Sequence, residues 1–333
     1  MSNMTPLVSV IIPIYNESKT LPYLLNDLNS QNFLNVEFIL INDGSTDGSQ
    51  ELIENFIRNT DDDRFILINQ LNSGVSCARN NGIEKSRGKY IMFADADDRL
   101  DKNFVREYVA KIVENNTDME VFSLKKIDNI DSLNIIERVD YSKLSKRKVT
   151  YSDFFRFLAD GIIHGYVVTY ITKRSLWDSI KFDSKVSYRE DEFVYCQMLI
   201  KNPDMKIHFN KESYYYYYIH NESATNSLSP SAVLQSIRIS EEIIQRANSV
   251  RKLNISQRKL NQLKSNFYWR MAVVSIVKKD NKSFSVAKDG YLKFYPRTDF
   301  YLKKLERTIE YILLKVHLDF ILKAAIQRVK SKD

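Results

Sequence analysis

Residues 8–98 alternate between short apolar runs, which are typical of strands, and longer segments with helical periodicity. The apolar runs cover residues 8–14, 36–41, 65–68 and 90–94, and the helical segments cover 18–30, a stretch that begins at 47, and 75–86. Repeated strand–helix units form a parallel sheet that is covered by helices. The alternation therefore predicts an α/β fold with a mostly parallel, twisted sheet flanked by helices.

Polar segments follow three of the predicted strands, at the point where each strand ends. They are Pro13–Glu17, Asn42–Gly48 and Asp95–Asp98. In a sheet of this kind, ligands bind outside the carboxyl ends of the strands. We therefore expect the three segments to converge on one crevice.

The third segment begins with Asp95, Ala96 and Asp97, directly after the apolar run 90–94. Two carboxylates one residue apart would lie at the rim of the sheet, and the small side chain of Ala96 lets a ligand approach closely. Oxygen ligands of this kind suit a hard divalent cation, and such cations usually hold substrate phosphates. The pattern predicts a site for a nucleotide diphosphate.

Two aspartates follow the second strand. Asp43 can accept hydrogen bonds from a base edge or a ribose, while Gly44 lets the backbone turn, and we favour a ligand contact for Asp43. For Asp47 we favour a role as a cap of the next helix.

Residues Asn72–Gly74 lead into a helix that carries Arg79. A helix N-terminus and an arginine both favour anions, so this segment is a candidate phosphate contact. The alternative is a surface helix with one snorkelling cation.

Glu190 and Asp191 open another predicted helix. Asp191 has two alternative roles. It is either a simple complement to the helix dipole or a general base, which must come within about 2.6–3.2 Å of an acceptor hydroxyl. His220 is either an ordinary polar residue or a ligand that completes a metal shell.

The remainder of the chain is less regular. Residues 125–150 are expected to form a hairpin or a loop, residues 166–172, 207–209 and 214–219 strands, and residues 151–159, 190–201, 230–251, 256–279 and 298–329 helices. Turn formers cluster at residues 227–230, so we expect one domain at residues 1–228 and a helical C-terminal region at residues 229–333.

Composition limits the setting of the protein. Cys77 and Cys196 cannot make a disulfide framework and are expected to be small buried side chains in a reducing compartment. No secretory signal and no apolar run long enough to span a bilayer are visible, so we expect a cytoplasmic protein.

The C-terminal segment is basic. The net charge is +7, and after residue 300 eight lysines and arginines stand against four acidic residues. Residues 298–329 have an amphipathic helical pattern, which can dock on the inner face of an anionic membrane or pack on the protein's own domain or a second subunit.

These motifs resemble family 2 glycosyltransferases of the GT-A fold over roughly residues 8–223. The motifs that carry the resemblance are Val8–Glu17, Asn42–Asp47, Asn72–Gly74 with Ala78–Asn80, and Asp95–Asp98. Their order and spacing make the signal specific.

The resemblance implies roles for individual residues. Asp43 would contact the nucleotide base, in a pocket lined by Pro13, Tyr15 and Glu17, and Asp95 would lie near the ribose. The remaining donor-binding candidates are Asn72, Gly74, Arg79 and Ala96. Asp97 would bind Mg²⁺ or Mn²⁺ that bridges the diphosphate, with His220 close to the metal, and Asp191 would be the base.

The implied activity is inverting transfer of a sugar, with a UDP-sugar as the expected donor, to a hydroxyl of a glycan or lipid-linked acceptor in bacterial surface polysaccharide assembly. The alternative is a catalytically degenerate domain that serves as a binding or scaffold protein. A dinucleotide dehydrogenase or sugar nucleotidyltransferase would need a glycine-rich loop where this chain has Pro13–Asn16. No pattern of basic residues interleaved with stacking aromatics indicates nucleic acid.

Overall fold

The computed structural model describes residues 5–147, 149–150, 153–155, 157, 162–186, 189–220 and 257–295, together with separate helical residues between 231 and 245. The chain divides into two compact units. The first unit takes its described residues from Met1–Phe154, His164–Lys185 and Glu190–Asn221, and the second from Phe155–Ile163, Val186–Arg189 and Glu222–Asp333. The boundary expected between residues 228 and 229 lies outside the described residues.

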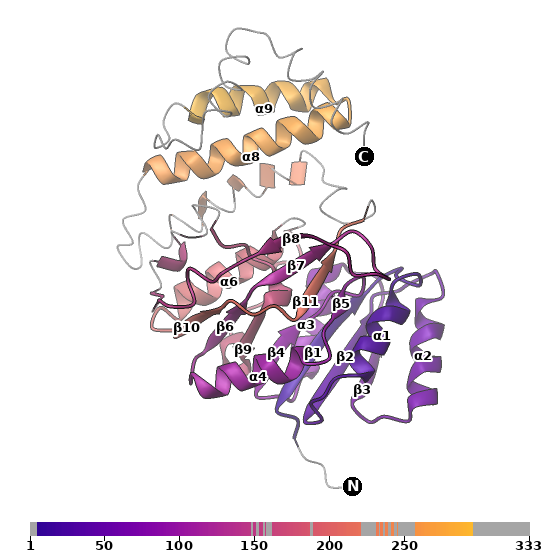
Figure 1. Ribbon diagram of the computed structural model, residues 1–333. Helices are drawn as coiled ribbons and strands as arrows, with labels where there is room; N and C mark the ends of the chain where they lie inside the picture. The colour runs from indigo at the N-terminus through magenta and orange to yellow at the C-terminus, as the bar shows by residue number, and fades with distance from the viewer. Residues whose placement is uncertain are drawn as a thin grey trace. The chain divides into compact units, whose positions relative to one another are not determined.

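A seven-stranded sheet forms the centre of the first unit, in the order β10-β6-β9-β4-β1-β2-β3 (Figure 1). Its strands are β1 Val8–Ile14, β2 Val36–Asn42, β3 Phe65–Asn69, β4 Tyr90–Phe93, β6 Met119–Phe122, β9 Tyr170–Lys173 and β10 Ile207–Asn210. Strand β1 runs parallel to both β2 and β4, whereas β9 runs antiparallel to β4 and β6. The predicted, mostly parallel sheet is confirmed.

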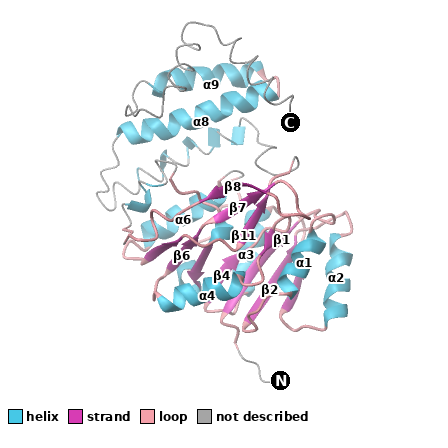
Figure 2. Cartoon of the chain, viewed as in Figure 1, coloured by secondary structure: helices cyan, strands magenta, loops and turns pink. Residues whose placement is uncertain are grey.

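Helices flank the strands of this unit (Figure 2). They are α1 Leu21–Asn29, α2 Ser49–Thr60, α3 Val75–Lys85, α4 Phe104–Glu114 and α6 Glu190–Lys201. Helix α3 packs on β1 and β2, and α4 packs on β6 and β9. Every residue of β1 and β2 is buried, because helices cover a parallel sheet on both faces, and this explains why both strands are mostly apolar. Of the cysteines, Cys196 is buried and Cys77 is partly buried, and neither forms a disulfide bond.

A smaller second sheet has the order β5-β11-β7-β8. Its strands are β5 Arg99–Leu100, β7 Leu124–Ile127, β8 Ile135–Val139 and β11 Tyr215–Tyr218. Strands β7 and β8 pair in antiparallel fashion, which confirms a hairpin within residues 125–150. Strand β11 pairs antiparallel with β5, so the tyrosine-rich segment lies beside the residues that follow Asp98.

The segment expected to be a strand at residues 166–172 is only partly extended. Val167–Thr169 forms a 3₁₀ turn, η1, before β9 begins at Tyr170. The backbone N–H and the hydroxyl of Thr169 both donate to the carbonyl oxygen of Tyr166, at 3.1 and 2.8 Å. A β-branched run has therefore been folded into a turn by a local side-chain hydrogen bond.

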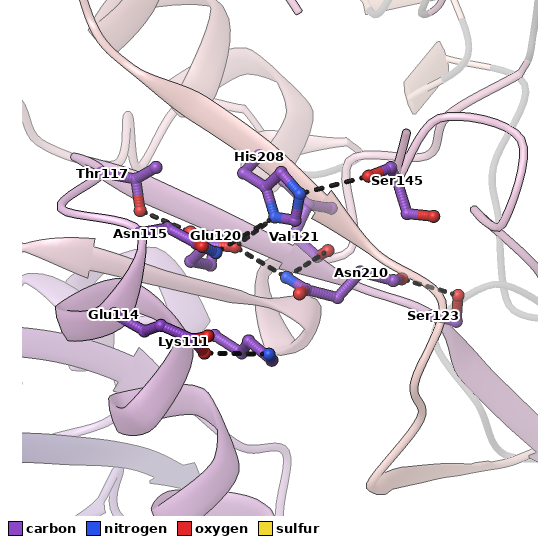
Figure 3. Close-up of polar contacts among 10 residues, drawn as sticks. All are labelled: Lys111, Glu114, Asn115, Thr117, Glu120, Val121, Ser123, Ser145, His208 and Asn210. Carbon is purple, nitrogen blue, oxygen red and sulfur yellow. Dashed lines mark hydrogen bonds and ion pairs between the residues drawn. The ribbon is translucent and has the colours of Figure 1, made fainter. Parts of the chain in front are cut away.

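A buried carboxylate on β6 forms polar contacts with side chains of β10 (Figure 3). Glu120 on β6 has no exposed surface, and it accepts hydrogen bonds from Thr117 at 2.5 Å, Asn115 at 3.0 Å and Asn210 at 2.7 Å. The ring of His208 lies 2.9 Å from the same carboxylate. Because a buried charge without partners is costly, this set of contacts fixes the strand pair in register.

The second unit contains two described helices that pack on one another, α8 Gln257–Val277 and α9 Asn281–Phe294. Phe267, Met271, Ala287 and Tyr291 are buried in its core. Helix α8 was expected at residues 256–279, but α9 was not expected, and the amphipathic segment 298–329 lies outside the described residues. Among the described residues, none of the helices combines the length and apolarity needed to cross a bilayer.

Candidate active site

The carboxyl ends of β1, β2 and β4 meet at one edge of the large sheet. Ile14 at the end of β1 is opposite Asn42 at the end of β2, and Phe93 of β4 is opposite Ile11. The loops that follow β1 and β2 are joined, because the backbone N–H of Asn16 donates to the Ser45 hydroxyl at 3.1 Å. The expected convergence of polar segments is confirmed for these two loops, and contacts of the third are given below.

Asp43 holds the loop that leads into α3. Its side chain is buried and accepts hydrogen bonds from Gln70 at 2.7 Å and from the backbone N–H groups of Ser73 at 2.9 Å and Gly74 at 2.8 Å. Next to it, Gly44 has φ of +71°, and a Cβ built there would lie 2.8 Å from the backbone nitrogen of Asn72. Asp43 and Gly44 therefore shape the segment 72–74, and contact between Asp43 and a nucleotide base stays a prediction.

Asp47 ties the first loop to the start of α2. It accepts from the N–H and the hydroxyl of Ser49 at 3.1 and 2.6 Å, and from the N–H of Ser18 at 2.8 Å. Partial desolvation opposes ionisation, but these hydrogen bonds outweigh it and lower the pKa of Asp47 to about 2. The residue at the cap position itself is Gly48, one position later than expected.

Arg79 joins two segments that are far apart in sequence. Its guanidinium is 5% exposed and forms ion pairs with Asp95 at 3.0 Å and with Glu190 at 2.8 Å. It also lies over the ring of Phe182, 5.4 Å from the centroid. Burial opposes the charge, but the two carboxylates outweigh it and raise the pKa of Arg79. The alternative reading of Arg79 as a snorkelling surface cation is therefore wrong, and its contact with a donor phosphate stays a prediction.

Asp191 follows Glu190 at the start of α6 and is half-buried. Burial, and then the adjacent charge of Glu190, raise the pKa of Asp191 to about 8, although Arg79 acts in the opposite direction. The hydroxyl of Tyr195, which is buried nearby, has no hydrogen-bond partner among the residues that the structure describes. A carboxylate in such surroundings is a stronger base than a solvated aspartate.

Asp97 and His220 face one another. Nε2 of His220 lies 2.9 Å from Oδ2 of Asp97, and we call these two residues the Asp97–His220 pair. Glu17, from the loop after β1, is close by: burial and then the charge of Asp97 raise the pKa of Glu17 to about 7. The segment after β4 therefore lies near the loop after β1, as the convergence of strand ends predicts.

A residue that sequence reasoning did not single out brings His220 to this place. Asp98 is fully buried and accepts hydrogen bonds from the Tyr215 hydroxyl at 2.6 Å and from the Tyr218 N–H at 2.7 Å. The hydroxyl of Tyr215 in turn accepts from the N–H of Asp95 at 3.0 Å. Burial, followed by the charges of Asp97 and Asp95, raises the pKa of Asp98 well above its usual range. The alternation of side chains along the tyrosine-rich strand predicts which face of the strand carries Tyr215, but it does not predict the hydrogen bond with Asp98.

The other expected site residues differ in exposure. Pro13 and Ala96 are buried, whereas Tyr15 is 47% exposed, and Asn72 and Gly74 are exposed. Tyr15 therefore offers an accessible ring at the end of β1, where the base pocket is expected.

The donor atoms fit a divalent cation held jointly by protein and substrate. Within the part of the chain that the structure describes, no cluster of three or more His, Cys, Asp or Glu side chains is arranged to hold a metal. The Asp97–His220 pair supplies one carboxylate and one imidazole. Cations that act on phosphates usually take only one or two protein ligands and complete their shell with phosphate oxygens and water. The residues present therefore fit Mg²⁺ or Mn²⁺ in this role.

Comparisons with known sequences agree with this arrangement. The sequence model described as Glycosyl transferase family 2 matches residues 9–169. An uncharacterized glycosyltransferase of Haemophilus influenzae is 33% identical over 180 residues, which cover 46% of this chain and 71% of that protein. Glycosyltransferase GlyA of Streptococcus pneumoniae is 28% identical over 216 residues, 63% of this chain but only 30% of GlyA. The uncharacterized glycosyltransferase EpsJ of Bacillus subtilis is 30% identical over 195 residues, 56% of this chain and 54% of EpsJ.

Solved structures show the same fold. Residues 1–349 of S. aureus TarS in complex with UDP-GlcNAc match with a TM-score of 0.56 at 19% identity, over 85% of this chain and 89% of that one. The mannosyltransferase PcManGT from Pyrobaculum calidifontis, in complex with GDP-Man and Mn²⁺, matches with a TM-score of 0.52 at 13% identity, over 99% of this chain and 89% of that one. The chain belongs to glycosyl transferase family 2 and has the GT-A fold.

Proposed function

We propose that this protein is a metal-dependent, inverting glycosyltransferase that moves a sugar from a nucleotide diphosphate sugar to an acceptor hydroxyl. The observation that supports this most is the double ion pair of Arg79, which holds Asp95, after β4, together with Glu190, at the start of α6. The expected donor-side and acceptor-side motifs are thereby parts of one charge cluster around buried Arg79.

A UDP-sugar is the proposed donor. The TarS structure was solved with UDP-GlcNAc. The accessible ring of Tyr15 follows Ile14, whose carbonyl oxygen accepts from the Asp43 N–H at 2.8 Å, and this ring offers a surface for a base. PcManGT was solved with GDP-Man, so the nucleotide is a variable that the experiment must test.

Asp191 is the proposed base. Its raised pKa of about 8 suits it to take a proton from an acceptor hydroxyl. The acceptor oxygen then forms a bond with the anomeric carbon on the face opposite the nucleotide, the bond from that carbon to the diphosphate oxygen breaks, and the nucleoside diphosphate leaves with the electron pair. A cation held by the Asp97–His220 pair would supply electrostatic stabilisation of the leaving diphosphate. Arg79 keeps Glu190, and thereby the start of α6, against Asp95 throughout.

The proposed setting is assembly of a cell-surface polysaccharide. A minor teichoic acid biosynthesis protein, GgaA of Bacillus subtilis, is 30% identical over 205 residues. The acceptor would then be a growing glycan, or a lipid-linked one.

The test is hydrolysis and transfer with UDP-, GDP- and dTDP-sugars, with and without Mn²⁺. We expect one donor class to be turned over, and only with the metal. Asp191→Asn should lower transfer at least about a hundredfold while nucleotide affinity is retained. Asp204→Asn is a matched control, because Asp204 is exposed on the same unit. Transfer by Asp191→Asn at the wild-type rate would show that another group is the base.

A further inference from the structure

Three ring side chains form a continuous run in the first unit, which we call the aromatic run: His164, Tyr166 and Tyr217. The ring centroids of Tyr166 and Tyr217 are 5.6 Å apart, with 42° between the ring planes, and those of His164 and Tyr166 are 5.4 Å apart. His164 is exposed, and the two tyrosines are half-buried. The rings come from two distant segments, the one that precedes η1 and strand β11.

One end of the aromatic run is attached to the start of α6. Gly165 approaches α6 so closely that a Cβ built on it would lie 2.9 Å from the backbone nitrogen of Glu192 and 2.6 Å from its Cα. The hydroxyl of Tyr170 donates to the carbonyl oxygen of His164 at 2.8 Å. Burial raises the pKa of Tyr170, and the nearby charge of Asp191 adds to the shift. The segment that carries Tyr166 therefore lies next to the proposed base.

The other end is attached to the Asp97–His220 pair. Tyr217 precedes Tyr218, whose N–H donates to buried Asp98 at 2.7 Å, and His220 follows two residues after Tyr218. Alternation along a strand puts Tyr217 on the same face as Tyr215, whose hydroxyl is bonded to Asp98. The aromatic run thus extends from the start of α6, which carries Asp191, toward the Asp97–His220 pair.

We propose that the aromatic run is the acceptor subsite and that it binds a pyranose ring of the acceptor. This inference rests on the proposed function, which does not specify the chemical class of the acceptor group. The reacting hydroxyl must lie within about 3 Å of the Asp191 carboxylate, so the remainder of the acceptor must rest on what borders Asp191. A pyranose presents a flat face of C–H groups, which stacks on the electron-rich faces of Tyr166 and Tyr217. An acyclic polyol has no such face and gains little from these rings.

The matched variants separate ring stacking from hydrogen bonding and from general damage. Tyr166→Leu and Tyr217→Leu remove a ring, and Tyr166→Phe and Tyr217→Phe keep the ring but remove the hydroxyl. Tyr216→Leu is the control, because Tyr216 is the neighbour on the opposite face of β11, where its ring lies 4.5 Å from Nζ of Lys125.

The measurement is release of nucleoside diphosphate from the donor that the protein hydrolyses, with and without added acceptor. The acceptors are the methyl glycosides of glucose, galactose and N-acetylglucosamine, with ribitol and glycerol as acyclic probes. We expect at least one pyranoside, and neither polyol, to accelerate release by the wild type. The ratio of stimulated to unstimulated rate should fall about tenfold in both Leu variants, and it should stay at the wild-type value in the Phe variants and in Tyr216→Leu.

Three results would overturn the proposal: wild-type stimulation in both Leu variants, stimulation by ribitol or glycerol alone, or donor hydrolysis that no pyranoside accelerates. A rise in the KM for the donor in the Leu variants, with acceptor stimulation retained, would reassign the rings to the donor. Absence of donor hydrolysis in the wild type would instead count against the proposed function, so the two failures are distinguishable.

Discussion

Asp191 should make the folded protein less stable as the pH rises, and Asp191→Asn should abolish this pH-dependent loss of folding free energy. Its folded-state pKa of about 8 exceeds the ordinary value of 3.8, because burial and the charge of Glu190 disfavour the carboxylate. A carboxyl group with a raised pKa binds its proton more tightly in the folded state. Stability is therefore highest below the unfolded-state pKa, and it is lost as the pH rises toward the folded-state pKa.

The two pKa values set the size of the effect. Linkage gives a cost in folding free energy of roughly 2 kcal/mol at pH 5 and roughly 5 kcal/mol at pH 8, since each pKa unit corresponds to about 1.4 kcal/mol. The stability difference between Asp191→Asn and the wild type should thus widen by about 3 to 4 kcal/mol over this range. For a unit of this size, that is about 10 °C in unfolding temperature.

The assay is differential scanning calorimetry of both proteins at pH 5, 6, 7 and 8, without nucleotide or metal. Asp204→Asn should follow the wild type at every pH, because the side chain of Asp204 is exposed. A constant offset between Asp191→Asn and the wild type from pH 5 to pH 8 would refute the reasoning, because the carboxyl would then titrate alike in the folded and unfolded states.

Three further outcomes are expected. Arg79→Met should lower the free energy of unfolding by about 3–5 kcal/mol in urea titrations, because it leaves the carboxylates of Asp95 and Glu190 without their cation. Arg79→Lys should not restore transfer, since an ammonium lacks the bidentate fork of a guanidinium. Equal stability of Arg79→Met and the wild type would count against the double ion pair of Arg79. Glu120→Ala should lower the urea midpoint by an amount equivalent to about 3 kcal/mol, because the buried donors around it lose their acceptor; an unchanged midpoint would show that the network adds nothing. The kcat/KM for transfer should rise tenfold per pH unit and level off near pH 8, which is the midpoint of the profile. Glu190→Gln should move this midpoint to lower pH, because the charge of Glu190 raises the pKa of Asp191. A midpoint that stays in place would mean that another group is titrating.

The sequence predicted the parts of the fold that are set by local pattern. Strand β1 was expected at residues 8–14 and α6 at residues 190–201, and both have these bounds in the structure. A period of 3.6 residues is strong where one face of a helix is buried, and a short apolar run bounded by turn residues is typical of a strand that is buried on both faces. Segment 166–172 departs from the prediction because a hydrogen bond of the Thr169 side chain, which no periodicity reports, converts part of it into a turn.

The site was predicted as a set of residue types but not as a set of contacts. The carboxylates after β4 and at the start of α6 were recognised, yet nothing in the sequence pairs Arg79 with both of them, because such pairings depend on how α3 and α6 pack on the sheet. Buried Asp98 was similarly visible only as one of several acidic residues. Its hydrogen bond with Tyr215 requires the second sheet, whose strand order is set by long-range pairing.

The central claim is that the Asp97–His220 pair holds a divalent cation that binds the donor diphosphate. Isothermal titration calorimetry of UDP and of GDP, with and without Mn²⁺, tests it most directly in the wild type and in Asp97→Ala. We expect one of these nucleotides to bind the wild type at least about tenfold more tightly with Mn²⁺ than without, and Asp97→Ala to lose this difference. Equal affinity with and without the metal in the wild type, or full metal dependence in Asp97→Ala, would contradict the claim.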